Sequence, residues 1–245
     1  MAALPLSLAS RVSDAESLLA RALRHEDTLA LSWPELEAAL PGGVIPRGVV
    51  EIASPRVHGC TSVALAVVRA AHARDARSWC AWIDPEGTLY SPGVEQAAID
   101  RARLLVVRPP RAELGRIAVK VVASGAFDVV VVDVDAIAMA REDEQGGTEA
   151  RRKRERVGGW NQRARRSVPP EVLVRKLAVA AEPSGARVLL LTDVLAPRAI
   201  AWPVTMRLEI EPGDESMRVR VAKDRRGGVG VAKTVPYDTR PGKSA

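Results

Sequence analysis

Short apolar runs alternate with Ala-rich segments along most of the chain. Runs that predict buried strands lie at 49–52, 79–84, 104–107, 127–133 and 187–192. Segments of helical character lie between them, at 61–74, 94–100, 112–124 and 171–181. Strands that alternate with helices predict a doubly wound, mainly parallel α/β sheet. Ligands of such sheets bind beyond the carboxyl ends of the strands, so residues that follow a strand are candidates for a site.

The pattern changes from residue 205 onward. Short alternating segments follow each other at 206–210, 217–222 and 229–234, separated by Gly-rich turns. Alternation with a period of two residues is typical of half-buried antiparallel strands. We therefore expect antiparallel hairpin strands at the C-terminal edge of the sheet.

The same pattern suggests how the chain is organised. A capping-box sequence at 13–16 predicts a helical N-terminal segment over residues 1–27. The core domain is expected over residues 28–237, followed by a flexible tail at 238–245. Inside the core, residues 141–168 are polar and lack periodicity, which predicts a long mobile loop.

Composition narrows the class of protein. Apolar residues make up 47% of the chain but aromatic residues only 3%, so the core has to be aliphatic. The apolar runs are too short to span a bilayer, and the N-terminus lacks the basic region of a secretory signal. Two cysteines fall short of a disulfide framework. We expect a cytoplasmic, nucleoid-associated protein with no membrane partner and no metal site.

One segment carries the basic charge. Residues 151–166 hold eight basic residues and one glutamate, a local charge of +7, whereas the whole chain has a net charge of +6. Arginines neutralise phosphates and an indole stacks on bases, so the segment predicts a contact with single-stranded DNA. The alternatives are a solvated run without a partner and a segment that docks on an acidic protein. The candidate DNA-binding residues are Arg151, Arg152, Lys153, Arg154, Arg156, Trp160, Arg163, Arg165 and Arg166.

A degenerate phosphate-binding loop is predicted between the first strand and the first helix of the core. A P-loop reads G-x-x-x-x-G-K-[ST], and residues 54–61 read SPRVHGCT. Ser54 replaces the first glycine and Cys60 replaces the lysine. The lysine carries the charge that reaches the terminal phosphates, so a neutral thiol predicts the loss of hydrolysis. Weak nucleotide binding and a plain strand-turn-helix corner are both open. The candidate residues are Ser54, Gly59, Cys60, Thr61 and Ser62.

The order of these features resembles the RecA recombinase core. LPGGVIPRGVVEI at 40–52 is similar to the turn and strand before that family's P-loop, and AWIDPE at 81–86 to the strand that ends in its catalytic glutamate. FDVVVVD at 127–133 is similar to its Walker B strand. The resemblance implies that Glu86 stands at the position of the catalytic base and Asp133 at that of the acid that holds Mg²⁺. Residual binding of ATP and Mg²⁺ is left open.

The resemblance also places three residues in the second half of the chain. Asp193 stands where the family carries a nucleotide-sensing glutamine. Lys223 and Arg225 match two lysines that reach the nucleotide of a neighbouring subunit. The basic segment falls in the first of the family's two DNA-binding loops. Because the lysine, the first glycine and the glutamine are all altered, we expect a chain that does not work as an ATPase.

Within that family, the short and degenerate form is similar to the ImuA accessory proteins of damage-inducible mutagenesis cassettes. The stretches 40–43 and 102–109 also look like that group. The resemblance implies a non-catalytic role in SOS-induced translesion synthesis, with RecA, a Y-family-like (ImuB-like) polymerase protein and a replicative polymerase as partners. The second hypothesis is a DNA-dependent ATPase recombinase with a degenerate P-loop. The third is a single-strand-binding module that acts alone.

Overall fold

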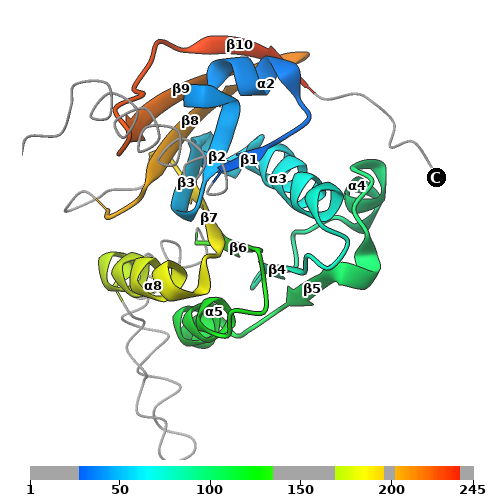
Figure 1. Ribbon diagram of the computed structural model, residues 1–245, viewed down its shortest axis with the longest axis vertical. Coiled ribbons are helices and arrows are strands. Elements are labelled where there is room, and N and C mark those ends of the chain that lie inside the picture. Colours follow the sequence, from blue (N-terminus) through cyan, green and yellow to red (C-terminus); the bar gives the residue numbers. More distant parts are fainter. Residues whose placement is uncertain (1–27, 135–168, 196–201, 238–245) are drawn as a thin grey trace, which may run out of the picture.

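The computed structural model describes residues 28–134, 169–195 and 202–237, which Figure 1 shows built on one large sheet. Within them eight strands form that sheet, in the order β10-β9-β8-β3-β7-β6-β4-β5, and β1 and β2 form a separate antiparallel pair. The strands are β1 (Thr28–Ala30), β2 (Val44–Pro46), β3 (Gly48–Ser54), β4 (Cys80–Ile83), β5 (Leu104–Val107), β6 (Val129–Asp133), β7 (Arg187–Asp193), β8 (Met206–Pro212), β9 (Ser216–Asp224) and β10 (Lys233–Pro236).

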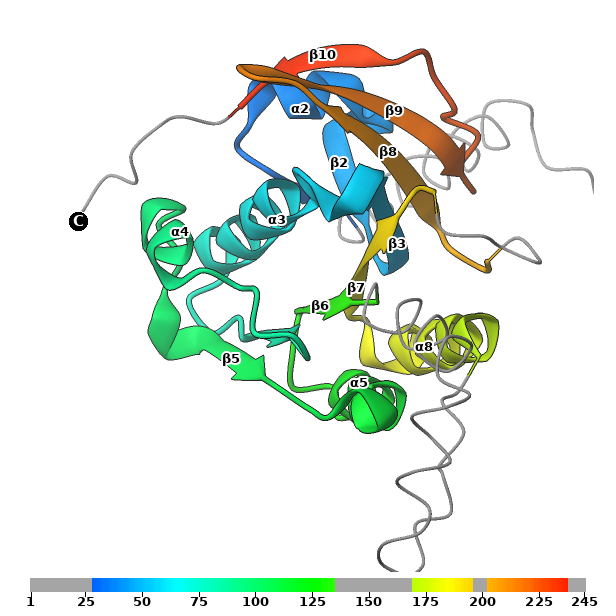
Figure 2. The same cartoon turned by 180° about the vertical axis from the view of Figure 1, so that it is seen from behind.

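The helices cover both faces of this sheet. In Figures 1 and 2, α5 and α8 lie side by side on one face, and α3 lies on the other face. The described α-helices are α2 (Pro34–Ala39), α3 (Cys60–Arg74), α4 (Ser91–Gln96), α5 (Leu114–Ala123) and α8 (Pro170–Ser184). Short 3-10 turns are η1 (Pro41–Gly43), η2 (Pro55–Val57), η3 (Arg101–Arg103) and η4 (Arg111–Glu113).

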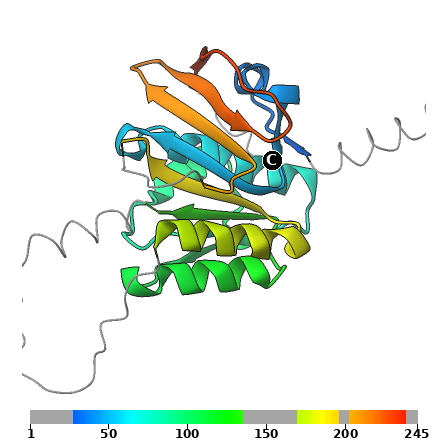
Figure 3. The same ribbon diagram turned by 90° about the vertical axis from the view of Figure 1, so that its left-hand side faces the viewer.

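The pairing of the strands confirms the predicted fold class. β8, β3, β7, β6, β4 and β5 are joined by parallel ladders, whereas β8–β9 and β9–β10 are antiparallel. Figure 3 shows the antiparallel strands at one end of the molecule, away from α5. The chain is thus a doubly wound α/β protein with hairpin strands at its C-terminal edge.

Two apolar clusters hold the layers together, one on each face of the sheet. On one face Val63 and Val67 of α3 pack in a cluster with Ile52 of β3. On the other face Leu114 of α5 and Leu177 of α8 share a cluster with strand residues of β3, β4, β6 and β7. Because β3 is buried along both faces, its carboxyl end is held firmly where the loop before α3 begins.

Two expected elements begin or end elsewhere. The strand expected at 229–234 is β10 at Lys233–Pro236, since the glycines at 227, 228 and 230 give the preceding segment no side chains to pack, and Val229 and Val231 are exposed. The helix expected at 94–100 is α4, which ends earlier, and residues 101–103 form η3. Among the described helices none is long and apolar enough to cross a membrane. The expected N-terminal segment, loop 141–168 and tail lie outside the described residues.

Candidate functional site: a degenerate phosphate-binding loop

The loop between β3 and α3 takes an unusual backbone path. Ser54 ends β3 in an extended conformation, and η2 follows at once. Arg56 (φ 52°) and Val57 (φ 60°) are left-handed, as is Gly59 (φ 81°). Left-handed backbone costs little at glycine, whereas at a β-branched residue such as Val57 it is strained. The loop thus makes its turn partly with residues that have side chains, which leaves less open space than a glycine-rich loop.

The thiol of Cys60 points back into the protein. Its one S–H proton is shared between two acceptors, the Ile52 carbonyl oxygen at 3.4 Å from Sγ and the Ser54 Oγ at 3.3 Å. Both Cys60 and Ser54 are completely buried. The two residues that depart from the P-loop pattern therefore bond to each other inside the loop. Thr61 and Ser62, in contrast, are exposed in the first turn of α3.

Glu86 is held by an arginine. The Arg111 guanidinium of η4 binds its carboxylate with two hydrogen bonds, Nε to Oε1 at 2.5 Å and Nη2 to Oε2 at 2.7 Å. These bonds lower the pKa of the Glu86 carboxyl group below its usual value. A carboxylate with a lowered pKa is a weaker proton acceptor, so the pair works against a role as general base. Sequence reasoning missed Arg111, because the two residues are 25 positions apart and only the β4–β5 pairing brings them together.

Asp84 directly follows β4 and begins the loop that carries Glu86. It is fully buried and accepts hydrogen bonds from the Thr88 amide at 2.8 Å and the Leu89 amide at 3.1 Å. Arg108 Nε lies 3.6 Å from its Oδ2. Asp84 therefore shapes the 84–89 loop rather than facing a ligand.

The sheet brings three of the predicted residues together at the carboxyl ends of its parallel strands. Ser54 of β3 is in register with Asp193 of β7, and Asp133 ends the next strand, β6, opposite Leu191. Asp193 Oδ1 accepts a hydrogen bond from the Leu195 amide at 2.9 Å, and the Ser54 carbonyl accepts one from the Val194 amide at 3.1 Å. The carboxylates of Asp133 and Asp193 thus lie at the carboxyl ends of neighbouring parallel strands, next to the region where α/β sheets bind ligands.

Lys223 and Arg225 lie at the end of β9, two strands away from β3, on the antiparallel part of the sheet. Lys223 Nζ donates to the Trp202 carbonyl oxygen at 2.7 Å, and burial lowers the pKa of its ammonium group. Arg225 is exposed just after β9. Lys223 therefore bonds within its own chain, and Arg225 faces solvent. The predicted DNA-binding residues at 151–166 lie outside the described residues.

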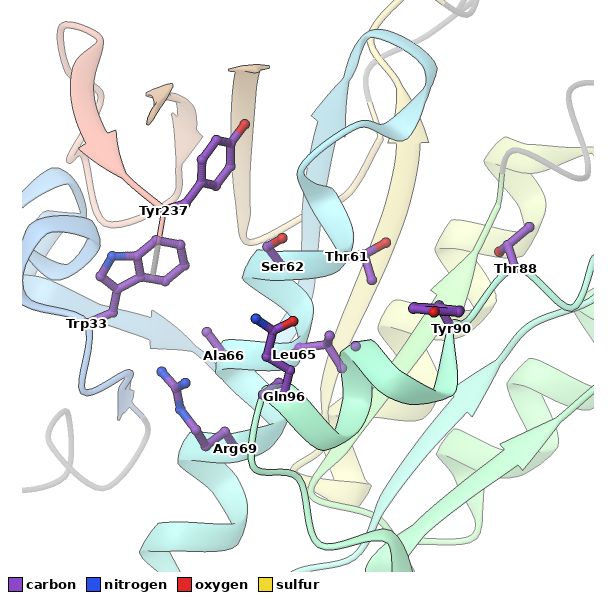
Figure 4. Close-up of a pocket in the computed structure, with 12 residues that line it drawn as sticks. Trp33, Thr61, Ser62, Leu65, Ala66, Arg69, Thr88, Tyr90, Gln96 and Tyr237 are labelled. Carbon is purple, nitrogen blue, oxygen red and sulfur yellow. The ribbon is translucent and has the colours of Figure 1, made fainter. Parts of the chain in front are cut away.

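A pocket of about 450 Å³ runs along α3 from its first turn. Thr61 and Ser62 line one part of it, and Arg69 lies two turns further along the helix (Figure 4). The exposed ring of Tyr90 and the rings of Trp33 and Tyr237 also line it, with Tyr90 on the opposite side from the other two in Figure 4. Of these only Thr61 and Ser62 were predicted, since single aromatic residues far apart in the sequence give no motif. Among the described residues no group of three His, Cys, Asp or Glu side chains could hold a metal ion.

Comparison with known proteins agrees with this geometry. The chain is 37% identical over 127 residues to "Protein RecA" of Rhodospirillum centenum, which covers 51% of this chain and 35% of that protein. It is 40% identical over 113 residues to "Protein RecA" of Deinococcus radiodurans, or 45% of this chain and 31% of that protein. For "Protein RecA" of Mycobacterium marinum the identity is 38% over 113 residues, with 45% and 32% covered.

These matches span about a third of the length of the curated relatives. The family model described as the RecA N-terminal domain matches residues 20–162, which is more than half of the chain. The matched stretch contains the β3–α3 loop, β4 with the loop that carries Glu86, and the β6 strand with Asp133. The chain belongs to the RecA N-terminal domain family.

Proposed function

We propose that this chain is a non-catalytic RecA-family accessory protein of DNA repair, of the ImuA type, which acts in SOS-induced translesion mutagenesis. It binds RecA, a Y-family-like polymerase protein, or both, and modulates the RecA filament on single-stranded DNA. A replicative polymerase is the expected third partner. The observation that carries the proposal is that the chain's own side chains occupy both functional ends of the nucleotide site: Cys60 bonds to Ser54, and Arg111 holds Glu86.

The loop does not fit the terminal phosphates of ATP. Position 60 carries no ammonium group, and its thiol is buried against β3. Thr61 and Ser62 in the first turn of α3 are exposed, and the N-terminus of a helix attracts an anion weakly through its backbone N–H groups. Asp133 fits the position of the acid that holds Mg²⁺. Because the charge that stabilises phosphoryl transfer is missing, we assign no catalytic step to the chain.

The retained features favour a role in binding. The strand order and the two apolar clusters keep the shape of the core, and Arg225 keeps an exposed positive charge at the position that in RecA reaches a neighbouring subunit. A subunit with this shape but without a nucleotide switch would join or cap a RecA filament and hinder strand exchange. The basic segment at 151–166 adds a contact to single-stranded DNA.

A RecA strand-exchange assay tests this proposal. We expect the purified chain to co-purify with RecA and to slow strand exchange. The variant Arg225→Glu reverses an exposed charge at the expected contact and should restore the rate. Lys120→Glu reverses an exposed charge on α5, on a different part of the surface, and should slow the reaction as the unmodified chain does. An unchanged rate together with no co-purification would overturn the proposal.

A further inference from the structure

A buried histidine lies at the end of α3 that is farthest from the phosphate loop. His72 is in the last turn of the helix and is only 7% exposed, and neither of its ring nitrogens has a hydrogen-bond partner among the described residues. The Oγ of Ser78, on the connection from α3 to β4, is also buried without a partner there. Burial of a polar group without a hydrogen bond costs free energy, so such a group in a folded protein needs an explanation.

The last turn of α3 packs near the starts of three parallel strands. Ala71 shares an apolar cluster with the first residues of β4 and β6, and β4, β5 and β6 begin in register. A polar residue precedes each strand: Ser78 precedes β4 by two positions, and Arg103 and Asp128 directly precede β5 and β6. The Asp128 amide donates to the Trp79 carbonyl oxygen at 2.9 Å and so joins the start of β6 to that of β4. The end of α3 therefore meets polar groups from three connections.

Arg103 ties this end of α3 to the turn before β5. Its Nη1 donates to the carbonyl oxygen of Asp75, the residue after α3, at 3.1 Å, and its Nε donates to Asp100 Oδ2 at 2.7 Å. The same Asp75 carbonyl accepts a hydrogen bond from the Ser78 amide at 3.0 Å, and the Asp75 amide donates to the Ala71 carbonyl oxygen at 3.2 Å. Residues 73–77 are all exposed, so opening this segment would uncover little apolar surface.

The surroundings of His72 oppose its protonation. Burial lowers the pKa of its imidazole below the ordinary value, and the positive charge of Arg103 lowers this pKa further, whereas Asp100 and Asp128 act in the opposite direction without reversing the shift. The neighbouring Cys80 thiol takes no part in this titration, because burial raises its pKa to about 12. Since the pKa of His72 is lower in the folded state, the closed arrangement has its full stability above the ordinary pKa of about 6.5 and loses stability as the pH falls below it.

We propose that His72 is a pH-sensitive switch at the C-terminal end of α3. Above about pH 6.5 the neutral ring stays buried, and Arg103 stays bonded to the Asp75 carbonyl oxygen. At lower pH the ring binds a proton and moves into water, which opens the last turn of α3 and the connection 75–79 while the central strands stay folded. This inference is independent of the proposed role with RecA, because the switch lies at the opposite end of α3 from the phosphate loop.

Hydrogen exchange of single amides, followed by NMR between about pH 5 and about pH 8, tests the switch. We expect the protection factors of the Asp75 and Ser78 amides to fall by up to about tenfold for each pH unit below 6.5, since opening is then coupled to the uptake of one proton. The amides of β7 should stay more protected at every pH, because the opening is local. His72→Gln introduces a side chain that stays neutral and should remove this pH dependence. His58→Gln, at an exposed histidine, is the matched control and should leave it unchanged.

The titration of the His72 ring itself gives a result that does not depend on how well His72→Gln folds. In the unmodified chain the ring Cε1–H signal should titrate with a midpoint below about pH 6.5. Arg103→Gln removes the positive charge but leaves Asp100 and Asp128, so it should raise this midpoint.

A midpoint of His72 at or above about pH 6.5 would overturn the proposal. Protection of the Asp75 and Ser78 amides that is constant below this pH, or that falls equally in His72→Gln, would also overturn it. If β7 lost its protection together with Ser78, protonation would unfold the whole chain, and there would be no local switch.

Discussion

Ser54 and Cys60, the two substituted residues of the phosphate loop, contact each other. A P-loop has its first glycine at the position of Ser54, so a buried serine hydroxyl group there needs a hydrogen-bond partner. A P-loop has its lysine at the position of Cys60, and the shorter cysteine side chain does not fill the space of the lysine stem. In this chain the Cys60 thiol lies within hydrogen-bond distance of both the Ser54 hydroxyl group and the Ile52 carbonyl oxygen, which share its one S–H proton. The substitutions therefore form a local packing unit.

ATP hydrolysis tests the roles of these single residues. With Mg²⁺ and single-stranded DNA present, we expect the chain to release phosphate no faster than its Glu86→Gln variant, because Cys60 supplies no positive charge and Arg111 already holds the glutamate. An authentic RecA serves as the positive control. Turnover by the chain that Glu86→Gln abolishes would instead support the second hypothesis, a recombinase with a degenerate P-loop.

At the scale of elements, the pattern of apolar residues identified every central strand of the sheet. β3, β6 and β7 are mostly apolar because they are buried along nearly their whole length, so their signal is strong. The predicted bounds of β10 and α4 were wrong, since glycines and turn residues leave boundaries poorly defined. The position of Ser54, Asp133 and Asp193 at one edge follows from the topology. The Glu86–Arg111 pair and the aromatic residues of the α3 pocket could not be predicted, because they depend on how distant segments pack.

The start of β3 allows a test of this architecture. Gly48 has φ 87°, and a Cβ atom there would lie 2.8 Å from the Thr205 Oγ1. Gly125 also has a positive φ, 66°, but a Cβ atom there would meet nothing within 4 Å. Gly125→Ala should lower the free energy of unfolding by about 1–2 kcal/mol through backbone strain alone. Gly48→Ala should lower it further, because it adds the close approach to Thr205. Urea unfolding measures both, and equal decreases would contradict this assignment.

At the scale of the whole molecule, the charge is divided unevenly. The segment 151–166 carries +7, more than the +6 of the whole chain, so the rest of the chain has a net charge of −1. This charge distribution is the basis for the proposal that the segment contacts single-stranded DNA while other parts of the chain bind proteins.

The salt dependence of binding to single-stranded DNA can show whether the segment 151–166 or another part of the chain makes the contact. Replacing the five basic residues among 151–156 with glutamine should weaken binding to single-stranded DNA and reduce the salt slope by about 0.7 for each phosphate that the segment no longer neutralises. Glutamine at Arg74 and Arg77, two exposed arginines of the folded body, is the control and should change neither. An unchanged slope in the first variant would show that the basic segment does not bind DNA.

The bond between Cys60 and Ser54 also bears on how this protein can change over time. A single substitution that restored lysine at position 60 would place an ammonium group in a completely buried position, beside a carbonyl and a hydroxyl group but no anion. Such a charge is costly to bury without a partner. A lysine at position 60 would therefore destabilise the fold unless the loop also changed its path. Under the proposed non-catalytic role, a lysine at position 60 is also not sufficient for turnover, because Arg111 still holds Glu86.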